Sequence, residues 1–266
     1  MNVTRIAVLG GGVMGEALIA GLLQLDPPPR ITVVEKRPER AQELTDRYAI
    51  QSAAAEVAAS DADIVIAVVK PQDMRAALTE IAESIPPAAL IISIAAGITT
   101  SAISRLLPHA SVVRAMPNTP ARIQQGVIGI SAGEHCSAEQ FEQAAVLLGA
   151  VGLVIEIPEG QQDAITATSG SGPAYFFYLA EAMMQGAQEV GLSESDARAA
   201  VVQTLLGSAE LLAGSTQSPE TLRINVTSPN GTTAAAIAVL DEQGVNATIV
   251  QAMLAARDRS QELASS

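Results

Sequence analysis

The stretch Arg5–Gly15, RIAVLGGGVMG, decides the fold of this chain. Arg5 is followed by four apolar residues, and this run predicts a buried strand over Arg5–Leu9; a helical pattern begins at Met14. The turn between them has the spacing G-x-G-x-x-G through Gly10, Gly12 and Gly15. The first glycine permits a tight turn, the second lets the backbone approach a pyrophosphate, and the third allows close packing of helix on strand.

Free N–H groups at the start of that helix, with the positive end of its dipole, suit the phosphates of a dinucleotide. We expect a pyrophosphate to lie against Gly10, Gly12, Val13, Met14 and Gly15. A glycine turn with a purely structural role is the alternative, because G-x-G-x-x-G by itself is a weak signal. The strand–turn–helix context favours dinucleotide binding.

The residues after the second predicted strand bear on which dinucleotide binds. Glu35 ends this strand, where an acid accepts a hydrogen bond from the ribose 2′-hydroxyl of NAD. Lys36 and Arg37 follow, and a basic pair there suits the 2′-phosphate of NADP. A solvated strand end beside Glu39 and Arg40 is a third interpretation. The choice between NAD and NADP stays open at this point.

The first half of the chain alternates short β-branched runs with helical patterns, which predicts a parallel sheet with helices on both faces. Two further strands, Val127–Ser131 and Leu153–Ile157, surround a predicted helix at Ala138–Leu148. The earlier predicted strands are Arg5–Leu9, Ile31–Val34, Asp63–Val69, Leu90–Ile94 and Ser111–Arg114.

After Pro158 the strand-like runs give way to long helical patterns. We expect an α/β domain over residues 1–158 and an all-helical domain over residues 159–266. The helix predicted at Ser193–Leu212 is apolar on nearly all sides, so it must be covered on all sides. We expect this helix to be buried in a subunit interface. The other long helical patterns are Pro173–Val190, Thr232–Gln243 and Ala247–Leu263.

Composition excludes several classes of protein. The 28 acidic and 15 basic residues give a net charge of −13, which leaves no basic surface for general nucleic-acid binding. A lone cysteine, Cys136, cannot form an internal disulfide and, with His135, lacks further ligands for a zinc site. The longest apolar stretch, Ala88–Ile98, is shorter than the ~20 residues that span a bilayer, and no signal peptide is evident. We expect a cytoplasmic protein without a metal, a membrane or a nucleic-acid partner.

The catalytic residues of several dehydrogenase classes are missing. The Tyr-x-x-x-Lys motif of short-chain dehydrogenases follows none of the tyrosines, and no lysine occurs after Lys70 to serve a β-hydroxyacid dehydrogenase. A histidine–carboxylate pair is available only through His109 or His135, both in loop-like settings. These absences favour a reaction without a demanding proton transfer, such as hydride addition to a C=N bond activated by its own proton.

Five further motifs follow in order: AVVKP at Ala67–Pro71, SIAAG at Ser93–Gly97, RAMPNTP at Arg114–Pro120, SGSGPAY at Ser169–Tyr175 and LRINVTSPNGTT at Leu222–Thr233. With the glycine loop they look like pyrroline-5-carboxylate reductase, a family that makes proline from its cyclic imine with NAD(P)H. The resemblance covers residues 5 to about 263. It implies an α/β Rossmann-type N-terminal domain followed by an all-α C-terminal dimerisation domain. It also implies NADP as cofactor, with NAD as the alternative, and a homodimer through the helical domain, often with further assembly of dimers.

By this resemblance, loops at the carboxyl ends of predicted strands line the nicotinamide and its ribose. The carboxyl ends of parallel strands form the crevice in which doubly wound sheets bind ligands. For Ala95–Gly97, small residues that serve only packing are the alternative. The residues implied are Val69, Lys70, Pro71, Ala95, Ala96, Gly97, Met116, Asn118 and Pro120.

The segment Asn225–Thr233 joins two predicted helices, and the N–H groups at the start of the second helix suit a carboxylate. By the resemblance, the Thr233 hydroxyl is the catalytic group and bonds the ring nitrogen of the substrate. No charged residue occurs between Arg223 and Asp241, so Thr233 orients rather than ionises. An ordinary helix cap is the alternative. The residues expected at the substrate carboxylate are Asn225, Val226, Ser228, Gly231 and Thr232.

Two other functions remain open at this stage: reduction of a related cyclic imine, and a non-catalytic NAD(P)-binding regulatory role. Arg114 and Arg223 are further candidates for the substrate carboxylate. Two positions depart from the family pattern. Glu35 stands where a neutral polar residue is frequent, and the alanine-rich stretch Gln51–Ala55 lacks an Asn that often contacts the adenosine.

Overall fold

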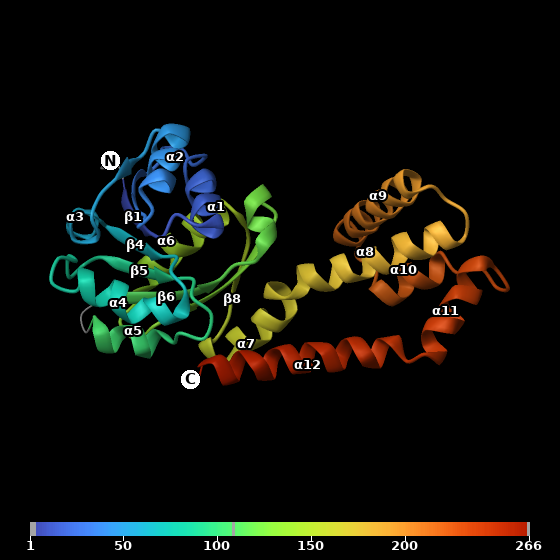
Figure 1. Ribbon diagram of the computed structural model, residues 1–266. Coiled ribbons are helices and arrows are strands. Elements are labelled where there is room, and N and C mark those ends of the chain that lie inside the picture. Colours follow the sequence, from blue (N-terminus) through green and yellow to red (C-terminus); the bar gives the residue numbers. More distant parts are fainter. Residues whose placement is uncertain (1–3, 108–109, 265–266) are drawn as a thin grey trace. The chain divides into compact units, whose positions relative to one another are not determined.

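The computed structural model describes residues 4–107 and 110–264. The chain divides into two compact units, one of Met1–Pro173 with Ala256–Ser266 and one of Ala174–Ala255. The first unit contains a sheet flanked by helices, and the second is helical (Figure 1). The predicted order, an α/β domain followed by an all-α part, is confirmed.

The described residues form one eight-stranded sheet in the order β3-β2-β1-β4-β5-β6-β7-β8. Every pair of neighbours is parallel except β6 and β7. The strand order reverses between β1 and β4, which is the place where such sheets bind ligands. The strands are β1 (Arg5–Leu9), β2 (Arg30–Val34), β3 (Gln51–Ser52), β4 (Ile64–Ala67), β5 (Leu90–Ser93), β6 (Ser111–Met116), β7 (Gly126–Ala132) and β8 (Gly152–Glu156).

The antiparallel strand β7 differs from the all-parallel sheet that the alternation predicts. Met116 at the end of β6 lies opposite Gly129, and Val113 lies opposite Ala132. Only the 3₁₀ turn η1 (Thr119–Ile123) and a few loop residues join the two strands. A parallel connection needs a crossover of a dozen or more residues, so this short link returns the chain antiparallel.

Successive residues of the strands face opposite sides of the sheet and form two apolar cores. Ile6 and Val8 belong to a buried cluster with residues of α1, α2 and α6. Ala7 and Leu9 belong to a second cluster with residues of α3, α4 and α5. Both faces of the sheet are therefore covered, as in doubly wound folds. The helices are α1 (Val13–Leu22), α2 (Pro38–Tyr48), α3 (Ala55–Ser60), α4 (Pro71–Ile81), α5 (Thr100–Leu106) and α6 (Ala138–Gly149).

The segment after Pro158 remains part of the first compact unit up to Pro173. The side chain of Gln162 is fully buried and donates to Gly129 C=O (3.2 Å) and to Ser131 Oγ (2.8 Å) on β7. These bonds hold the segment against the sheet, although the sequence after Pro158 has the helical patterns of the second unit. Its elements are η2 (Glu159–Gln161), α7 (Gln162–Ile165) and the π-helical turn η3 (Thr166–Gly170).

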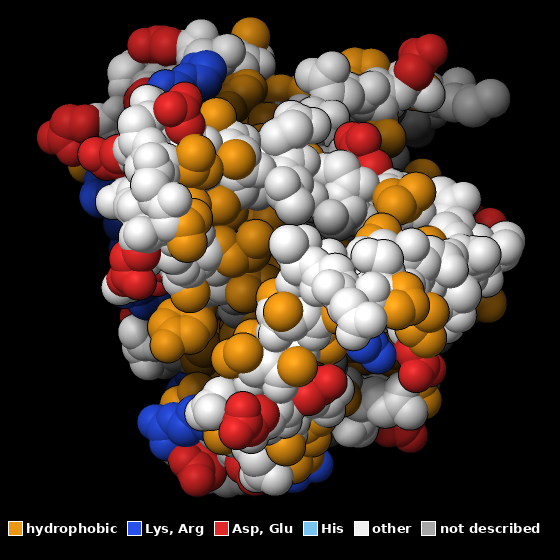
Figure 2. Space-filling model, turned by 90° about the vertical axis from the view of Figure 1, so that its right-hand side faces the viewer, with side chains coloured by type: hydrophobic (Ala, Val, Ile, Leu, Met, Phe, Trp, Pro, Cys, Tyr) orange, Lys and Arg blue, Asp and Glu red, His pale blue; other side chains and the backbone are white. Residues whose placement is uncertain are grey.

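The helical unit exposes many apolar side chains. On α9, Ala197 and Val201 are buried, but Leu206 is 55% and Leu211 60% exposed. Hydrophobic side chains are visible across the surface in Figure 2. Within the described ranges, no helix combines the length and the apolarity needed to cross a membrane. The helices are α8 (Gly172–Glu189), α9 (Glu194–Ala213), α10 (Pro219–Asn225), α11 (Thr232–Glu242) and α12 (Val245–Ala264).

Candidate active site

The three glycines of the G-x-G-x-x-G motif have different surroundings. Gly10 has a φ of 110°, and a Cβ there would lie 2.6 Å from the carbonyl oxygen of Val68. A Cβ on Gly15 would meet the carbonyl of Gly10, so this glycine allows the close packing of α1. Gly12 differs, because a Cβ there would meet nothing within 4 Å. Gly10 and Gly15 are thus required by the fold, whereas Gly12 leaves an open space over the backbone.

That open space lies at the start of α1. Gly12 is the N-cap residue, and its carbonyl accepts the first helical hydrogen bond, from Glu16 N–H (2.9 Å). The N–H groups of Val13 and Met14 precede the helical ladder and are therefore available to an external acceptor. Backbone donors, an accessible glycine and a helix N-terminus together fit the pyrophosphate of a dinucleotide.

Gly11, between these glycines, is held through both of its backbone polar groups. Its N–H donates to Glu35 Oε2 (3.1 Å), and its carbonyl accepts from Arg40 Nε (2.9 Å). A Cβ on Gly11 would lie 2.5 Å from Leu44 Cδ1 and 3.2 Å from Glu35 Oε2. Side chains that follow β2 therefore fix the glycine loop, and a side chain on Gly11 would require Leu44 to shift.

Arg40 belongs to a partly buried ionic cluster around Glu16. Its guanidinium bonds Glu16 (2.5 Å) and Glu43 (2.7 Å), and Glu16 also accepts from Arg47 and from the Tyr48 hydroxyl (3.0 Å). Burial raises the pKa of Glu16, but the hydrogen bonds from Arg40 and Tyr48 outweigh it and hold that pKa below its usual value. Arg40 is not solvated, since its side chain is only 17% exposed, whereas the side chain of Arg37 is 64% exposed.

Parallel strands bring the predicted cofactor residues of the first unit to one edge of the sheet. Leu9 pairs with Ala67 and Ala67 with Ser93, so β1, β4 and β5 end in register, while β6 continues past Arg114, the partner of Ser93, to Met116. Gly97 has a φ of 76°, a backbone conformation that favours glycine. This explains the glycine that ends the SIAAG motif. The predicted segments that begin at or just after these strand ends are Gly10–Gly15, Val69–Pro71, Ala95–Gly97 and Met116–Pro120.

Asn118 is the one member of this set whose side chain has a clear structural role. It is 8% exposed, donates from Nδ2 to the carbonyl of Ser169 (3.0 Å), and accepts at Oδ1 from Val127 N–H (2.8 Å). These bonds tie the loop after β6 to η3 and to β7. Its amide is therefore engaged in fixing the loop.

In the second unit, the segment Asn225–Thr233 joins α10 to α11. Gly231 is the N-cap of α11, and Ala235 N–H is the first donor to reach its carbonyl (3.2 Å). The N–H groups of Thr232 and Thr233 precede the helical ladder, as the carboxylate hypothesis requires. The N–H of Gly231 instead donates to the carbonyl of Ser228 (3.0 Å), and the Asn225 amide donates to Gln217 Oε1 (3.1 Å).

Three further candidates have other surroundings. His135 is exposed in the turn before α6, and its carbonyl accepts from Ser111 Oγ (2.9 Å). His109 lies outside the described residues. Arg114 is buried beside Glu159 (3.6 Å), and that carboxylate accepts from the N–H (2.7 Å) and hydroxyl (2.8 Å) of Thr100. Arg114 thus contributes to packing around α5.

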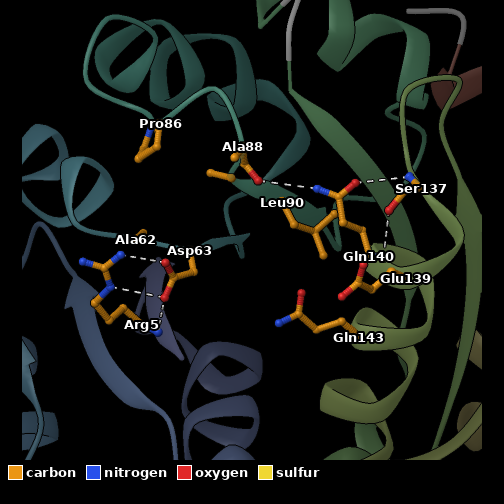
Figure 3. Close-up of a pocket in the computed structure, with 11 residues that line it drawn as sticks. Arg5, Ala62, Asp63, Pro86, Ala88, Leu90, Ser137, Glu139, Gln140 and Gln143 are labelled. Atoms are coloured by element: carbon orange, nitrogen blue, oxygen red, sulfur yellow. Dashed lines mark hydrogen bonds and ion pairs between the residues drawn. The ribbon is translucent and has the colours of Figure 1, made fainter. Parts of the chain in front are cut away.

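A cavity of about 670 Å³ lies at the opposite edge of the sheet, where β1, β4 and β5 begin (Figure 3). On one side of the cavity, Arg5 donates a hydrogen bond to Asp63, and this bond lowers the pKa of the Asp63 carboxyl. On the other side, Gln140 donates to the carbonyl of Ala88 (3.4 Å). Because the glycine loop follows the carboxyl end of β1, this cavity is separate from the dinucleotide crevice.

Known proteins resemble this chain over its whole length. A family model for pyrroline-5-carboxylate reductase dimerisation matches residues 159–263, and one for coenzyme F420-dependent NADP oxidoreductases matches residues 5–97. The pyrroline-5-carboxylate reductase of Pseudomonas aeruginosa is 43% identical over 268 residues, covering 99% of this chain and 98% of the relative. A pyrroline-5-carboxylate reductase structure from Coxiella burnetii has a TM-score of 0.91 and 35% identity, covering 98% of this chain and 99% of that one.

A second solved structure was determined with a cofactor. It is a pyrroline carboxylate reductase from Plasmodium falciparum with NADP bound, at a TM-score of 0.87 and 25% identity, covering 99% of this chain and 98% of that one. Fold, motif order and full-length similarity agree. The chain belongs to the pyrroline-5-carboxylate reductase family.

Proposed function

We propose that this chain reduces the C=N bond of 1-pyrroline-5-carboxylate to give L-proline, with NADPH as hydride donor. The observation that carries this proposal is the presence, in one chain of this family, of a glycine loop that fits a pyrophosphate and an intact Asn225–Thr233 segment. Nothing in the described residues favours a related cyclic imine or a purely regulatory role.

In this proposal the loop from Gly10 to Gly15 binds the pyrophosphate through the N–H groups of Val13 and Met14. Lys36 and Arg37 lie where a 2′-phosphate would meet them, after β2. When bound, the reduced nicotinamide supplies the hydride. The loops after β4, β5 and β6 surround it: Val69, Lys70, Pro71, Ala95, Ala96, Gly97, Met116 and Pro120, with Asn118 holding the last loop in shape.

The substrate carboxylate is assigned to the start of α11. The Thr232 and Thr233 N–H groups precede the helical ladder there, and the positive end of the helix dipole favours an anion. Gly231 serves the turn before α11, where a Cβ would collide with Ser228 Oγ. The half-buried Thr233 hydroxyl orients the ring nitrogen, and after hydride transfer it relays a proton from water to the amine nitrogen of the product. The substrate, already an iminium, needs no stronger acid.

We also propose a functional division near Pro158, with cofactor binding in residues 1–158 and substrate binding and dimerisation in residues 159–266. The exposed leucines of α9, which the chain leaves uncovered, support a homodimer through the helical part, with further assembly of dimers. A cytoplasmic location accords with the lone cysteine, Cys136.

The test is a spectrophotometric assay of the purified chain with a panel of cyclic imines and both reduced coenzymes. We expect coenzyme oxidation with 1-pyrroline-5-carboxylate and formation of one proline for each coenzyme consumed. Faster turnover of a six-membered cyclic imine, or no turnover of any imine, would overturn the proposal.

A further inference from the structure

A second cavity lies between α4 and α5, two helices that cover the same face of the sheet and lie side by side (Figure 1). Its volume is about 740 Å³, which is within the usual range for small-molecule sites. Its walls come from α4, from α5 with the residue that follows Gly97, and from Leu263 near the end of α12. All of these residues belong to the first compact unit.

The floor of this cavity is aliphatic. Met74 of α4 and Ile103 of α5 are buried and belong to the second apolar core. Ile98 and Leu106 are half-buried and pack against the same core. None of the described residues that line the cavity is aromatic. The floor therefore offers a straight apolar chain a surface to cover, without a flat ring on which a planar ligand would stack.

Two exposed arginines stand at the rim of the cavity. Arg75 is four residues after the start of α4, and Arg105 is five residues after the start of α5. Because both helices begin at the carboxyl edge of the sheet, the two arginines lie at a similar depth, a little over one helical turn from that edge. Neither guanidinium forms an ion pair or hydrogen bond with another residue that the structure describes.

The charge of the lining indicates the class of ligand. The chain has a net charge of −13, yet no acid is among the described residues that line this cavity. Asp73, on the first turn of α4, is not part of the lining, and Glu262, beside Leu263, pairs with Arg259 (2.7 Å). A guanidinium binds a carboxylate through two parallel N–H···O bonds. The rim thus suits an anionic head, and the floor suits an aliphatic tail.

We propose that this cavity binds a straight-chain aliphatic carboxylate, whose tail lies on Met74 and Ile103 and whose head meets Arg75 and Arg105. The inference does not rest on the proposed reaction. No residue of the glycine loop lines the cavity, so the site is separate from the one proposed for the pyrophosphate. Pro71 and Ile98 adjoin the loops proposed for the nicotinamide, and NADP⁺ is therefore included in the test as a competitor.

The experiment titrates decanoate into the full chain by calorimetry. We expect saturable binding of one decanoate per chain. Decyltrimethylammonium, which has the same tail and the opposite charge, should bind at least about tenfold more weakly. The double variant Arg75→Gln/Arg105→Gln should also lose at least about tenfold in decanoate affinity, because two charge-assisted hydrogen-bond donors are removed. Saturation with NADP⁺ should leave the affinity for decanoate unchanged.

The matched control is Arg30→Gln, which removes the same charge at an exposed position at the start of β2 and should keep the affinity. Ala102→Leu narrows the cavity, keeps both arginines and should weaken binding, so it tests the site even if the double variant does not fold. Absence of decanoate binding, equal affinity in the double variant, equal binding of the cationic amphiphile or displacement by NADP⁺ overturns the proposal.

Discussion

The Arg40 guanidinium donates a 2.9 Å hydrogen bond to the carbonyl oxygen of Gly11, the residue whose N–H is held by Glu35. Two side chains that follow β2 therefore satisfy both polar groups of one glycine in the loop after β1. The phosphate-binding turn is shaped by contacts between distant parts of the chain as well as by its own glycines.

Arg40→Ala should weaken binding of both NAD⁺ and NADP⁺ about tenfold, because a charge-assisted hydrogen bond contributes roughly 1.5–3 kcal/mol. Titration calorimetry with each coenzyme measures the change. Arg30→Ala is the control, since Arg30 begins β2 at the opposite edge of the sheet. Coenzyme affinity equal to that of the unmodified chain would show that the loop keeps its shape without Arg40.

Gly10→Ala and Gly12→Ala should separate stability from binding. At Gly10 the positive φ and the nearby Val68 carbonyl should lower the free energy of unfolding by about 1–3 kcal/mol. At Gly12 the added methyl group meets nothing in the protein but occupies the space proposed for the pyrophosphate. Chemical denaturation should leave Gly12→Ala near normal, while calorimetry should show coenzyme affinity reduced at least about tenfold. Normal affinity in Gly12→Ala would contradict the site.

The Glu16 cluster predicts how stability depends on pH. The pKa of Glu16 is lowered in the folded chain, so its stabilising contribution is present above the unfolded pKa of about 4.3 and is lost as pH falls below it. Glu16→Gln should therefore lower Tm at about pH 7, and the difference from the unmodified chain should shrink toward about pH 3. Glu80→Gln, an exposed acid on α4, is the control. A Tm difference independent of pH would refute the ionic contribution.

Thr233→Ala should lower kcat on the order of 10²-fold, the usual scale for a group that positions a transferred proton. Thr233→Ser keeps the hydroxyl and should recover most of the activity. Thr248→Ala removes a hydroxyl that bonds the carbonyl of Gly244 and should leave turnover unchanged. Steady-state assays with saturating imine measure all three. Full turnover in Thr233→Ala would remove this residue from the mechanism.

Leu206→Glu should disrupt assembly of the chain, because burying an unpaired charge in an apolar interface is costly. Light scattering at micromolar concentration should find a dimer or larger species for the unmodified chain and a monomer for the variant. Val57→Glu, a change at an exposed apolar residue of α3 in the other unit, should not alter the mass. A monomeric unmodified chain would contradict the proposed interface.

Strands with long apolar runs could be predicted from sequence because they are buried on both faces. Arg5–Leu9 matches β1 in full, and Leu90–Ile94 exceeds β5 by one residue. The two-residue strand β3, Gln51–Ser52, carries no apolar signal and exists through pairing with Thr32 and Val33. The sequence likewise does not predict the π-helical turn η3.

In the candidate site, too, the sequence indicates some features and does not indicate others. The glycine spacing and the strand-end motifs depend on local backbone geometry, so the sequence indicates them directly. Arg40 and Glu16 act through a pairing between α1 and α2, and no local pattern encodes such a contact. The internal bond of Gly231 to Ser228 could not be predicted either, because it depends on the turn that Asn230 makes at a φ of 58°.

The double restraint on Gly11 has a thermodynamic consequence. A loop whose central residue is already fixed loses little conformational entropy when a ligand arrives, since that loss occurs during folding. Coenzyme association should therefore be close to rigid docking, with a heat-capacity change that reflects buried surface rather than ordering of the chain. The Gly11 amide should also exchange slowly with solvent deuterium before any coenzyme is added.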